Sequence, residues 1–433
     1  MQNATDTMER HSRDMASALL VLFKTSMVYD LSNAVLHKPM ENYLKAVNAI
    51  AEEHGGSETR FLGDMVYVNR VLVRPDSALF SQVRSINKIL NKLKLKEIVT
   101  VGTITTEDLL QFLSAVKEAM NHPNASDVLR QTSLENIKFK DIVESQGQSE
   151  LSPQMKALRS YIATLFTIRD LIARIEQQKD VSIAPTKRAT RDLVSMVYAE
   201  EQTMLGLIQM RQHRGKPFHR LVNCAVLVSA MCKRLKLDRV SAAETALGAS
   251  LHDLDWSGNS DHHTSIRHLV RIYRSDRIGL LRVCVTGDVG NPQGLGTSRL
   301  ISVAERYERL TSIGERQSNG SMKRLMPDEA LRQIESQAGK EFDELAVKLL
   351  INTLGIFPIG TTVQLASGEI CIVVELPDDG RNISQPVVKI VKNAQGQPAD
   401  GRLLDLTAYP DAQIVRSVEP DAMDLNVTHF FLA

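Results

Sequence analysis

The spacing of apolar residues changes along the 433-residue chain and divides it into three parts. In the first part, residues 1–145, helical and strand-like spacings predict, in order, a helix over 15–29, a helix over 39–53, strands within 61–74, a helix over 77–94 and a strand over 98–101. Thr105 and Asp108 then have the spacing of a capping box, which begins a helix over 107–120. This part is therefore predicted to be an α+β module.

The second part, residues 155–358, has a helical period almost throughout. Its first helix carries an apolar stripe at steps of three and four, made of Leu158, Ile162, Leu165, Ile168, Ile172 and Ile175. Such a stripe indicates a helix face in the core of a helical domain, and the alternative is the seam of a homodimer. Pro185 interrupts the pattern, and helices are predicted again from 191 to 354.

The third part, residues 360–433, changes to an alternation of apolar and polar residues. The alternating runs lie over 363–365, 370–374, 387–391 and 404–406. Turn-forming residues such as Ser367-Gly368 separate them, which is typical of short antiparallel strands. The chain is thus predicted to be multidomain and mainly α, with a small all-β domain at its C-terminal end.

Charge and composition exclude several classes of partner. The net charge is +1 and aromatic residues make up 5% of the chain, so neither an electrostatic nor a base-stacking case for nucleic acid exists. The apolar run at 18–23 is far shorter than the roughly 20 residues of a membrane span. The four cysteines have no metal-ligand spacing, which favours a reduced, cytoplasmic compartment.

One His-Asp pair is the main candidate for chemistry. His252 and Asp253 follow the apolar helical run 242–251, His219 lies upstream near the start of another apolar helix, and His263 follows downstream. Imidazole and carboxylate groups together suit first-row divalent metals. Adjacent residues on a helix point about 100° apart, so both reach one ion only between packed helices. The alternative is a pair of core residues that only form hydrogen bonds.

Several blocks from His219 onward, in the right order, resemble the HD-GYP family of cyclic-di-GMP phosphodiesterases in the HD superfamily. Residues 246–253 resemble the run that ends in the family's HD doublet. Residues 282–295 can be laid without gaps on the signature HHExxDGxGYPxGL, and residues 299–311 follow RIxxVADxYDALT. The resemblance implies an all-α, HD-type helical bundle whose motif core spans 219–358.

The same resemblance predicts a degenerate metal site. The side chains that keep a ligand type are His219, His252, Asp253, His263 and, in place of an aspartate, Glu305. The family's paired histidines and glutamate are replaced by Arg282, Val283 and Cys284. We therefore expect no catalytic residue and no cofactor, and the alternative is one divalent ion (Mn, Fe or Zn) at a remnant site.

Two further features of the resembling region remain as candidate binding surfaces. The GYP-like loop keeps Gly290 and Pro292, with Asn291 in place of the tyrosine. Basic residues at helical steps, which suit phosphate or carboxylate partners, comprise Arg267, Arg271 and Arg274, with Arg282 following. The plain alternative for these arginines is a solvated helix face.

The sequence as a whole favours a bacterial signalling scaffold that acts through protein contacts without hydrolysis. Its implied partner is a protein such as a diguanylate cyclase or another signalling protein. Two alternatives stay open. One is an unconventional metal-dependent cyclic-di-GMP phosphodiesterase that uses the retained ligands. The other is a receptor in which the arginines hold the phosphates of cyclic-di-GMP without hydrolysing it.

Overall fold

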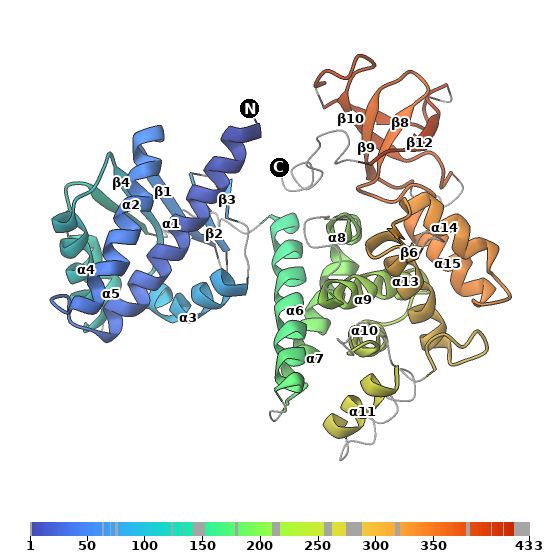
Figure 1. Cartoon of the computed structure of the whole chain (residues 1–433), viewed down its shortest axis with the longest axis horizontal. Coiled ribbons are helices and arrows are strands. Elements are labelled where there is room, and N and C mark those ends of the chain that lie inside the picture. The colour runs from blue at the N-terminus through green and yellow to red at the C-terminus, as the bar shows by residue number, and fades with distance from the viewer. Residues whose placement is uncertain are drawn as a thin grey trace. The chain divides into compact units, whose positions relative to one another are not determined.

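The computed structural model places most of the chain in two compact units, Met1–Leu151 and Ser152–Ala433 (Figure 1). It describes residues 2–62, 65–69, 71–73, 77–122, 124–132, 134–141, 152–177, 181–209, 217–254, 262–273, 288–316, 321–377, 382–399, 401–409 and 411–419. The described chain is mainly helical, as predicted. None of its helices is long and apolar enough to cross a membrane.

The first unit combines helices with one antiparallel sheet. Its helices are α1 (Gln2–Val28), α2 (His37–His54), α3 (Ser77–Leu93), α4 (Thr106–Met120) and α5 (Ala125–Gln131). Its strands are β1 (Gly56–Leu62), β2 (Met65–Val68), β3 (Val71–Leu72), β4 (Leu95–Val101) and β5 (Ile137–Asp141). The strand order is β3-β2-β1-β4-β5, and the neighbouring strands are antiparallel.

Most elements of this unit lie where the apolar pattern predicts them, and Thr105 and Asp108 form the expected capping box at α4. Helix α1 is longer than predicted and begins at Gln2 instead of residue 15. Its first turns are polar and contain neither proline nor glycine, so the helix continues where the apolar period gives no signal. The short elements α5 and β5 were not predicted.

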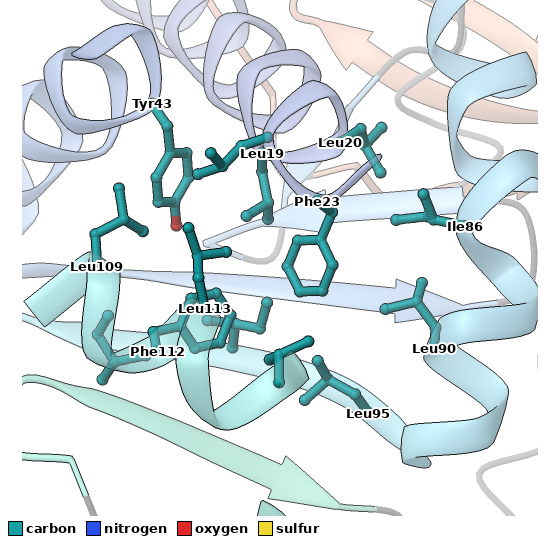
Figure 2. Packing of buried hydrophobic residues seen from close by; sticks show 14 of the residues in the cluster. Leu19, Leu20, Phe23, Tyr43, Ile86, Leu90, Leu95, Leu109, Phe112 and Leu113 are labelled. Atoms are coloured by element: carbon teal, nitrogen blue, oxygen red, sulfur yellow. The ribbon is translucent and has the colours of Figure 1, made fainter. Parts of the chain in front are cut away.

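Aromatic side chains from α1, α4 and β5 join the helices to the sheet. Figure 2 shows Phe23, Tyr43 and Phe112 among leucine side chains in this core. The Phe112 ring centroid lies 5.4 Å from that of Phe139 in a stacked arrangement and 5.7 Å from that of Phe23 in an edge contact. Phe112 thus contacts both layers.

Helix α9 lies at the centre of the second unit. The helices of this unit are α6 (Pro153–Glu176), α7 (Ala184–Ala199), α8 (Glu201–Ile208), α9 (Pro217–Arg234), α10 (Arg239–Leu251), α11 (His262–Tyr273), α13 (Gly296–Ser312), α14 (Pro327–Ser336) and α15 (Glu344–Leu354). Helix α9 packs against α6, α7, α8, α10, α13 and α15, and the side chains from Phe218 to Cys232 are buried except for His219, which is half-buried. A helix apolar on all sides is typical of such a central position.

Two details of the helical part bear on the sequence prediction. The start of α7 corrects it, and the burial of the α6 stripe decides between its two alternatives. Helix α7 begins at Ala184, not near residue 191, because Pro185 lies in its first turn, where a helix tolerates proline. In the α6 stripe, Leu158, Leu165, Ile168 and Ile172 are buried, and α6 packs against α7, α8 and α9. The stripe therefore belongs to the core of this unit.

The C-terminal strands form the predicted antiparallel sheet. They are β8 (Thr362–Leu365), β9 (Ile370–Glu375), β10 (Val387–Lys392), β11 (Leu403–Asp405) and β12 (Ile414–Ser417), in the order β11-β10-β9-β8-β12. Strand β12 was not predicted, because apolar and polar residues do not alternate along it. Its neighbouring residues Val415 and Arg416 are both exposed. The Ser417 hydroxyl donates a hydrogen bond to the Asp328 carboxylate of α14, so this sheet is bonded directly to the helices.

Truncation of Phe112 tests the role of the aromatic core. We expect Phe112→Ala to lower the free energy of unfolding of the first unit by about 3–5 kcal/mol, because it removes a buried ring and leaves a cavity. Calorimetric unfolding measures the change. Val35→Ala is the matched control, since Val35 is 51% exposed. Equal midpoints for the two variants would contradict this account of the core.

Candidate functional site

The His-Asp pair lies at the buried C-terminal end of α10. Asp238 begins this helix by accepting hydrogen bonds from the backbone N–H groups of Val240 and Ser241. The alanine-rich run that follows packs closely on α9 and brings the helix end into the core. His252 is fully buried and Asp253 is 6% exposed. Both side chains are therefore buried where α10 ends, and their role stays a prediction.

A buried arginine from the central helix contacts the aspartate of this pair. Arg220 Nη2 lies 3.0 Å from Asp253 Oδ2 and donates a hydrogen bond to it. The same nitrogen lies 3.5 Å from Oε1 of Glu305 on α13. Glu305 Oε1 also accepts a hydrogen bond of 2.8 Å from Arg309 Nε. One guanidinium nitrogen therefore bridges two carboxylates that come from different parts of the chain.

The cluster holds Glu305 as an anion and His252 as a neutral ring. Burial raises the pKa of Glu305, but the positive charges of Arg309 and Arg220 oppose it, and its pKa is lowered. Burial lowers the pKa of His252, against the opposing effects of Glu305 and Asp253. His252 Nδ1 lies 2.7 Å from the Ala249 carbonyl oxygen, which only accepts, so Nδ1 carries the proton. Nε2 of the neutral ring is then a bare acceptor.

Two buried acceptor atoms of the pair have no hydrogen-bond partner among the described residues. They are His252 Nε2 and Asp253 Oδ1. Nε2 of the neutral His252 ring and a carboxylate oxygen are both acceptors, so the two atoms do not satisfy one another. Buried polar atoms are rarely left unpaired, and each such atom calls for an explanation.

The described residues do not fit the metal that the family resemblance implies. Within the described ranges, no three His, Cys, Asp or Glu side chains converge on one point in a way that would hold an ion. Transition-metal ligands lie about 2.0–2.2 Å from the ion, whereas Asp253 and Glu305 are separated by a guanidinium nitrogen at 3.0 and 3.5 Å. A divalent cation would also lie beside two arginines, which disfavours it electrostatically.

The sequence prediction names His219, and its neighbour Arg220 is the residue that contacts Asp253. Adjacent residues on a helix point about 100° apart, and Arg220 is the one that contacts Asp253. His219 is half-buried, and its ring centroid lies 4.9 Å from that of Phe218. A ligand role for His219 stays a prediction. Arg220 was missed because an arginine beside a histidine in an apolar helix has no motif of its own.

A second buried polar network lies beside the first and was also missed. Tyr161 of α6 donates a hydrogen bond of 2.7 Å to Asn223 Oδ1, and Asn223 Nδ2 donates one of 2.8 Å to Glu308 Oε1. The hydroxyl of Ser312 donates to the same Glu308 oxygen. Burial, with a smaller contribution from the charge of Glu308, raises the pKa of Tyr161. These bonds join α6, α9 and α13. The available signal in the sequence was Asn223, a polar residue within an apolar run.

The GYP-like loop is held by one carboxylate that the motif comparison did not single out. Asp288 Oδ2 accepts hydrogen bonds from the Leu295 backbone N–H and the Ser298 hydroxyl, and Oδ1 accepts one from Asn291 Nδ2. A Cβ atom on Gly294 would overlap this carboxylate. Gly290 has a φ of 94°, in the left-handed region that favours glycine. Gly290 and Gly294 thus have a structural reason that does not depend on catalysis.

The remaining predicted residues lie around α11 and the loop. Pro292 is half-buried within the GYP-like loop. Arg267 and Arg271 are exposed on α11, and Leu269 of the same helix is buried. Ser265 accepts a hydrogen bond from the Leu254 backbone N–H, which ties α11 to the end of the His-Asp segment. The side chain of His263, and Arg274 and Arg282 altogether, lie outside the described residues.

Comparisons with known proteins give one curated relative and one similar structure, and no family model matches the chain. The cyclic di-GMP phosphodiesterase PA4108 of Pseudomonas aeruginosa is 22% identical over 294 residues, which cover 60% of this chain and 68% of that protein. The HDG"Y"P protein Bd1817 of Bdellovibrio bacteriovorus is 12% identical, with a TM-score of 0.37 over 68% of this chain and 93% of the other. The curated relative confirms the predicted resemblance to cyclic-di-GMP phosphodiesterases. The chain is therefore related to proteins of cyclic-di-GMP signalling.

The ionisation of the HD-GYP-like pocket predicts a loss of stability in acid. The pKa of His252 is lowered from 6.5 and that of Glu305 from 4.5, so the unfolded chain takes up protons before the folded one. Their contribution to stability is present above these values and is lost as the pH falls. We expect the thermal midpoint to fall steadily from pH 7 towards pH 4. Far-ultraviolet circular dichroism followed on heating measures the midpoint.

Two substitutions locate the effect. In His252→Gln, the part of the decline that begins near pH 6.5 should disappear. His122→Gln, which changes an exposed histidine of the first unit, should keep the full decline. A midpoint that does not change with pH in the wild-type protein would show that the pocket carries no such ionisation.

Proposed function

We propose that this protein is a catalytically inactive HD-GYP-like signalling protein that works as a scaffold through protein contacts. The observation that carries the proposal is the bridge from Arg220 Nη2 to Asp253 and Glu305. In a metal-dependent hydrolase, carboxylates of this kind hold the ion that activates water. Here both carboxylates neutralise an arginine.

The chemistry of the guanidinium group supports this proposal. Arginine has only donor N–H groups and stays protonated in proteins, so it neither accepts a proton from water nor supplies an open coordination position. Water activation by a metal requires the ion's Lewis acidity at an open position. The replacement of the family's paired histidines and glutamate by Arg282, Val283 and Cys284 removes further ligand types.

The surface around the GYP-like loop is the proposed contact site for a partner. The loop is braced internally by Asp288, while Gly290 and Asn291 are exposed and Leu295 is 51% exposed. A loop that is already ordered loses little conformational entropy on binding. Arg267 and Arg271 add exposed positive charge on α11. An acidic signalling protein, such as a diguanylate cyclase, fits this chemistry.

Two other functions each have one observation in their favour. The unpartnered atoms His252 Nε2 and Asp253 Oδ1 favour a remnant metal-dependent phosphodiesterase. The exposed pair Arg267 and Arg271 favours a receptor that binds the phosphates of cyclic-di-GMP without hydrolysis. The buried Arg220 bridge weighs against the first, and nucleotide binding without turnover would identify the second.

Measurement of hydrolysis tests the main proposal. We expect no conversion of cyclic-di-GMP or its linear dinucleotide, with or without added Mn²⁺ or Fe²⁺, because Asp253 and Glu305 are held by Arg220. Chromatography of the reaction products checks this, with the Pseudomonas aeruginosa phosphodiesterase PA4108 as the positive control. Metal-dependent conversion that Asp253→Asn abolishes would establish an active enzyme instead.

Charge reversal on α11 tests the contact surface. We expect the double variant Arg267→Glu, Arg271→Glu to capture less of its partner than the wild-type protein when both are used as bait in host extract. Wild-type capture should weaken with added salt, because surface charges are screened over about 10 Å at 0.1 M ionic strength. Arg188→Glu with Arg191→Glu reverses two exposed arginines of α7 and is the matched control. Equal, salt-independent capture by all three proteins would place the contact elsewhere.

A further inference from the structure

The turn that joins α9 to α10 combines positive charge with exposed apolar side chains. Residues 233–240, here called the α9–α10 tip, contain four basic side chains and one carboxylate, although the whole chain has a net charge of only +1. We propose that this tip binds the surface of an anionic lipid bilayer. It lies at the opposite end of the 13-residue helix α10 from His252, about 20 Å away along the helix axis. The tip involves none of the residues of the GYP-like loop or of α11, so this binding goes beyond the proposed function.

The apolar side chains of the tip are the first observation. Leu235, Leu237 and Val240 have exposed fractions of 49%, 37% and 68%. Every residue from 234 to 241 is exposed, whereas α9 before the tip and α10 after it are buried over most of their length. The tip is therefore a convex projection where two packed helices meet, and its apolar groups face outward.

The backbone at the apex of the tip favours glycine, but the residue there is a lysine. Lys236 has a φ of 57°, in the left-handed region that is costly for residues with a side chain. The Leu237 N–H donates a hydrogen bond of 3.0 Å to the Cys232 carbonyl oxygen, which ends α9 in a turn whose left-handed position is most often glycine. The Lys236 side chain is exposed, so the strained position adds a charge at the surface and no packing in the core.

One carboxylate of the neighbouring helix α8 pairs with two of the basic residues. Glu201 lies 2.7 Å from Lys233 Nζ and 3.3 Å from Arg234 Nε. These ion pairs join the tip to α8. Because two cations share a single carboxylate, this group of three side chains keeps a net positive charge.

The carboxylate within the tip is engaged by the backbone. Asp238 Oδ1 accepts hydrogen bonds from the N–H groups of Val240 and Ser241 in the first turn of α10. A carboxylate at this position interacts with the positive end of the helix dipole. The other two basic side chains, Lys236 and Arg239, are exposed and lie between the apolar residues of the tip. Positive charge and apolar surface thus occur together on one projection.

A bilayer surface fits this combination better than a protein partner. A convex tip cannot enclose a partner's side chains, whereas the fluid interface of a bilayer closes around projecting apolar groups. Basic groups beside them bind the anionic headgroups. The Arg239 guanidinium carbon lies 6.0 Å from the centre of the Tyr198 ring, and the Tyr198 hydroxyl donates a hydrogen bond of 2.8 Å to the Leu237 carbonyl oxygen. The tip therefore also has an aromatic ring of the kind that is enriched at membrane interfaces.

Co-sedimentation of the full-length protein with lipid vesicles tests the proposal. The wild-type protein should bind vesicles of phosphatidylcholine mixed with phosphatidylglycerol, and should bind pure phosphatidylcholine vesicles much more weakly. Added salt should weaken the binding, because surface charges are screened over about 10 Å at 0.1 M ionic strength. Lys236→Gln with Arg239→Gln should lower the partition constant about 25-fold, since each basic residue near an anionic surface contributes about fivefold.

Matched variants elsewhere in the same unit control for charge and for apolar surface. Lys340→Gln with Lys348→Gln neutralises two exposed lysines and should bind vesicles as the wild type does. Leu235→Gln with Val240→Gln removes apolar surface from the tip and should lower the partition constant roughly tenfold. Leu345→Gln, which changes a 74% exposed leucine of α15, should leave it unchanged.

Lys236→Gly separates vesicle binding from folding. Glycine adopts the positive φ without strain, so the variant should fold as the wild type does and keep or raise its thermal midpoint in circular dichroism. The loss of one charge should still lower the partition constant about fivefold. Wild-type binding by this variant would contradict the role of the lysine.

Three further outcomes would overturn the proposal. The first is that the wild-type protein does not bind anionic vesicles. The second is that the tip variants and their matched controls change the binding equally. The third is retention of the wild-type protein on immobilised polyglutamate without any vesicle binding, which would assign the tip to an acidic protein partner instead.

Discussion

A charge enclosed between packed helices must keep its partners, because the interior cannot replace the hydration that the charge has lost. The second unit of this protein depends on that constraint at Arg220. The central helix α9 is buried over nearly its whole length, and its guanidinium group meets Asp253 and Glu305 there. Removal of one member of such a group leaves a buried charge without a partner. The stability lost in this way exceeds the net stability that the intact group contributes. The helices α9, α10 and α13 are therefore coupled through their charges as well as through their apolar faces.

The neighbouring network of Tyr161, Asn223 and Glu308 extends the same principle to α6. Each polar group in it is satisfied by another, and the bonds are directional, so the helices pack in one register. Two buried acceptors of the neighbouring His-Asp pair, His252 Nε2 and Asp253 Oδ1, have no partner among the described residues. The pocket thus combines retained ligand types with a cation that belongs to the chain.

The shape of the GYP-like loop by itself requires two glycines of the motif. Gly294 is required because the Asp288 carboxylate occupies the space of a side chain, and Gly290 is required by its positive φ. Both requirements concern the shape of the loop, and neither involves water activation. A rigid, exposed loop beside a charge-neutralised pocket is what a protein-binding scaffold needs, which is why the proposed function assigns the contact surface to this region.

The sequence by itself determined the parts of this protein that depend on local spacing. The period of apolar residues, the capping box at Thr105 and the order of the HD-GYP-like blocks predict most helices, the C-terminal sheet and the location of the candidate pocket. Only the tertiary structure decided which side chains meet in the pocket. Because α9 is apolar on all sides, no stripe in its sequence indicates which face Arg220 or His219 takes. The bridge from Arg220 to Asp253 and Glu305 joins three separate segments, and it exists only because the packing of α9, α10 and α13 brings them together.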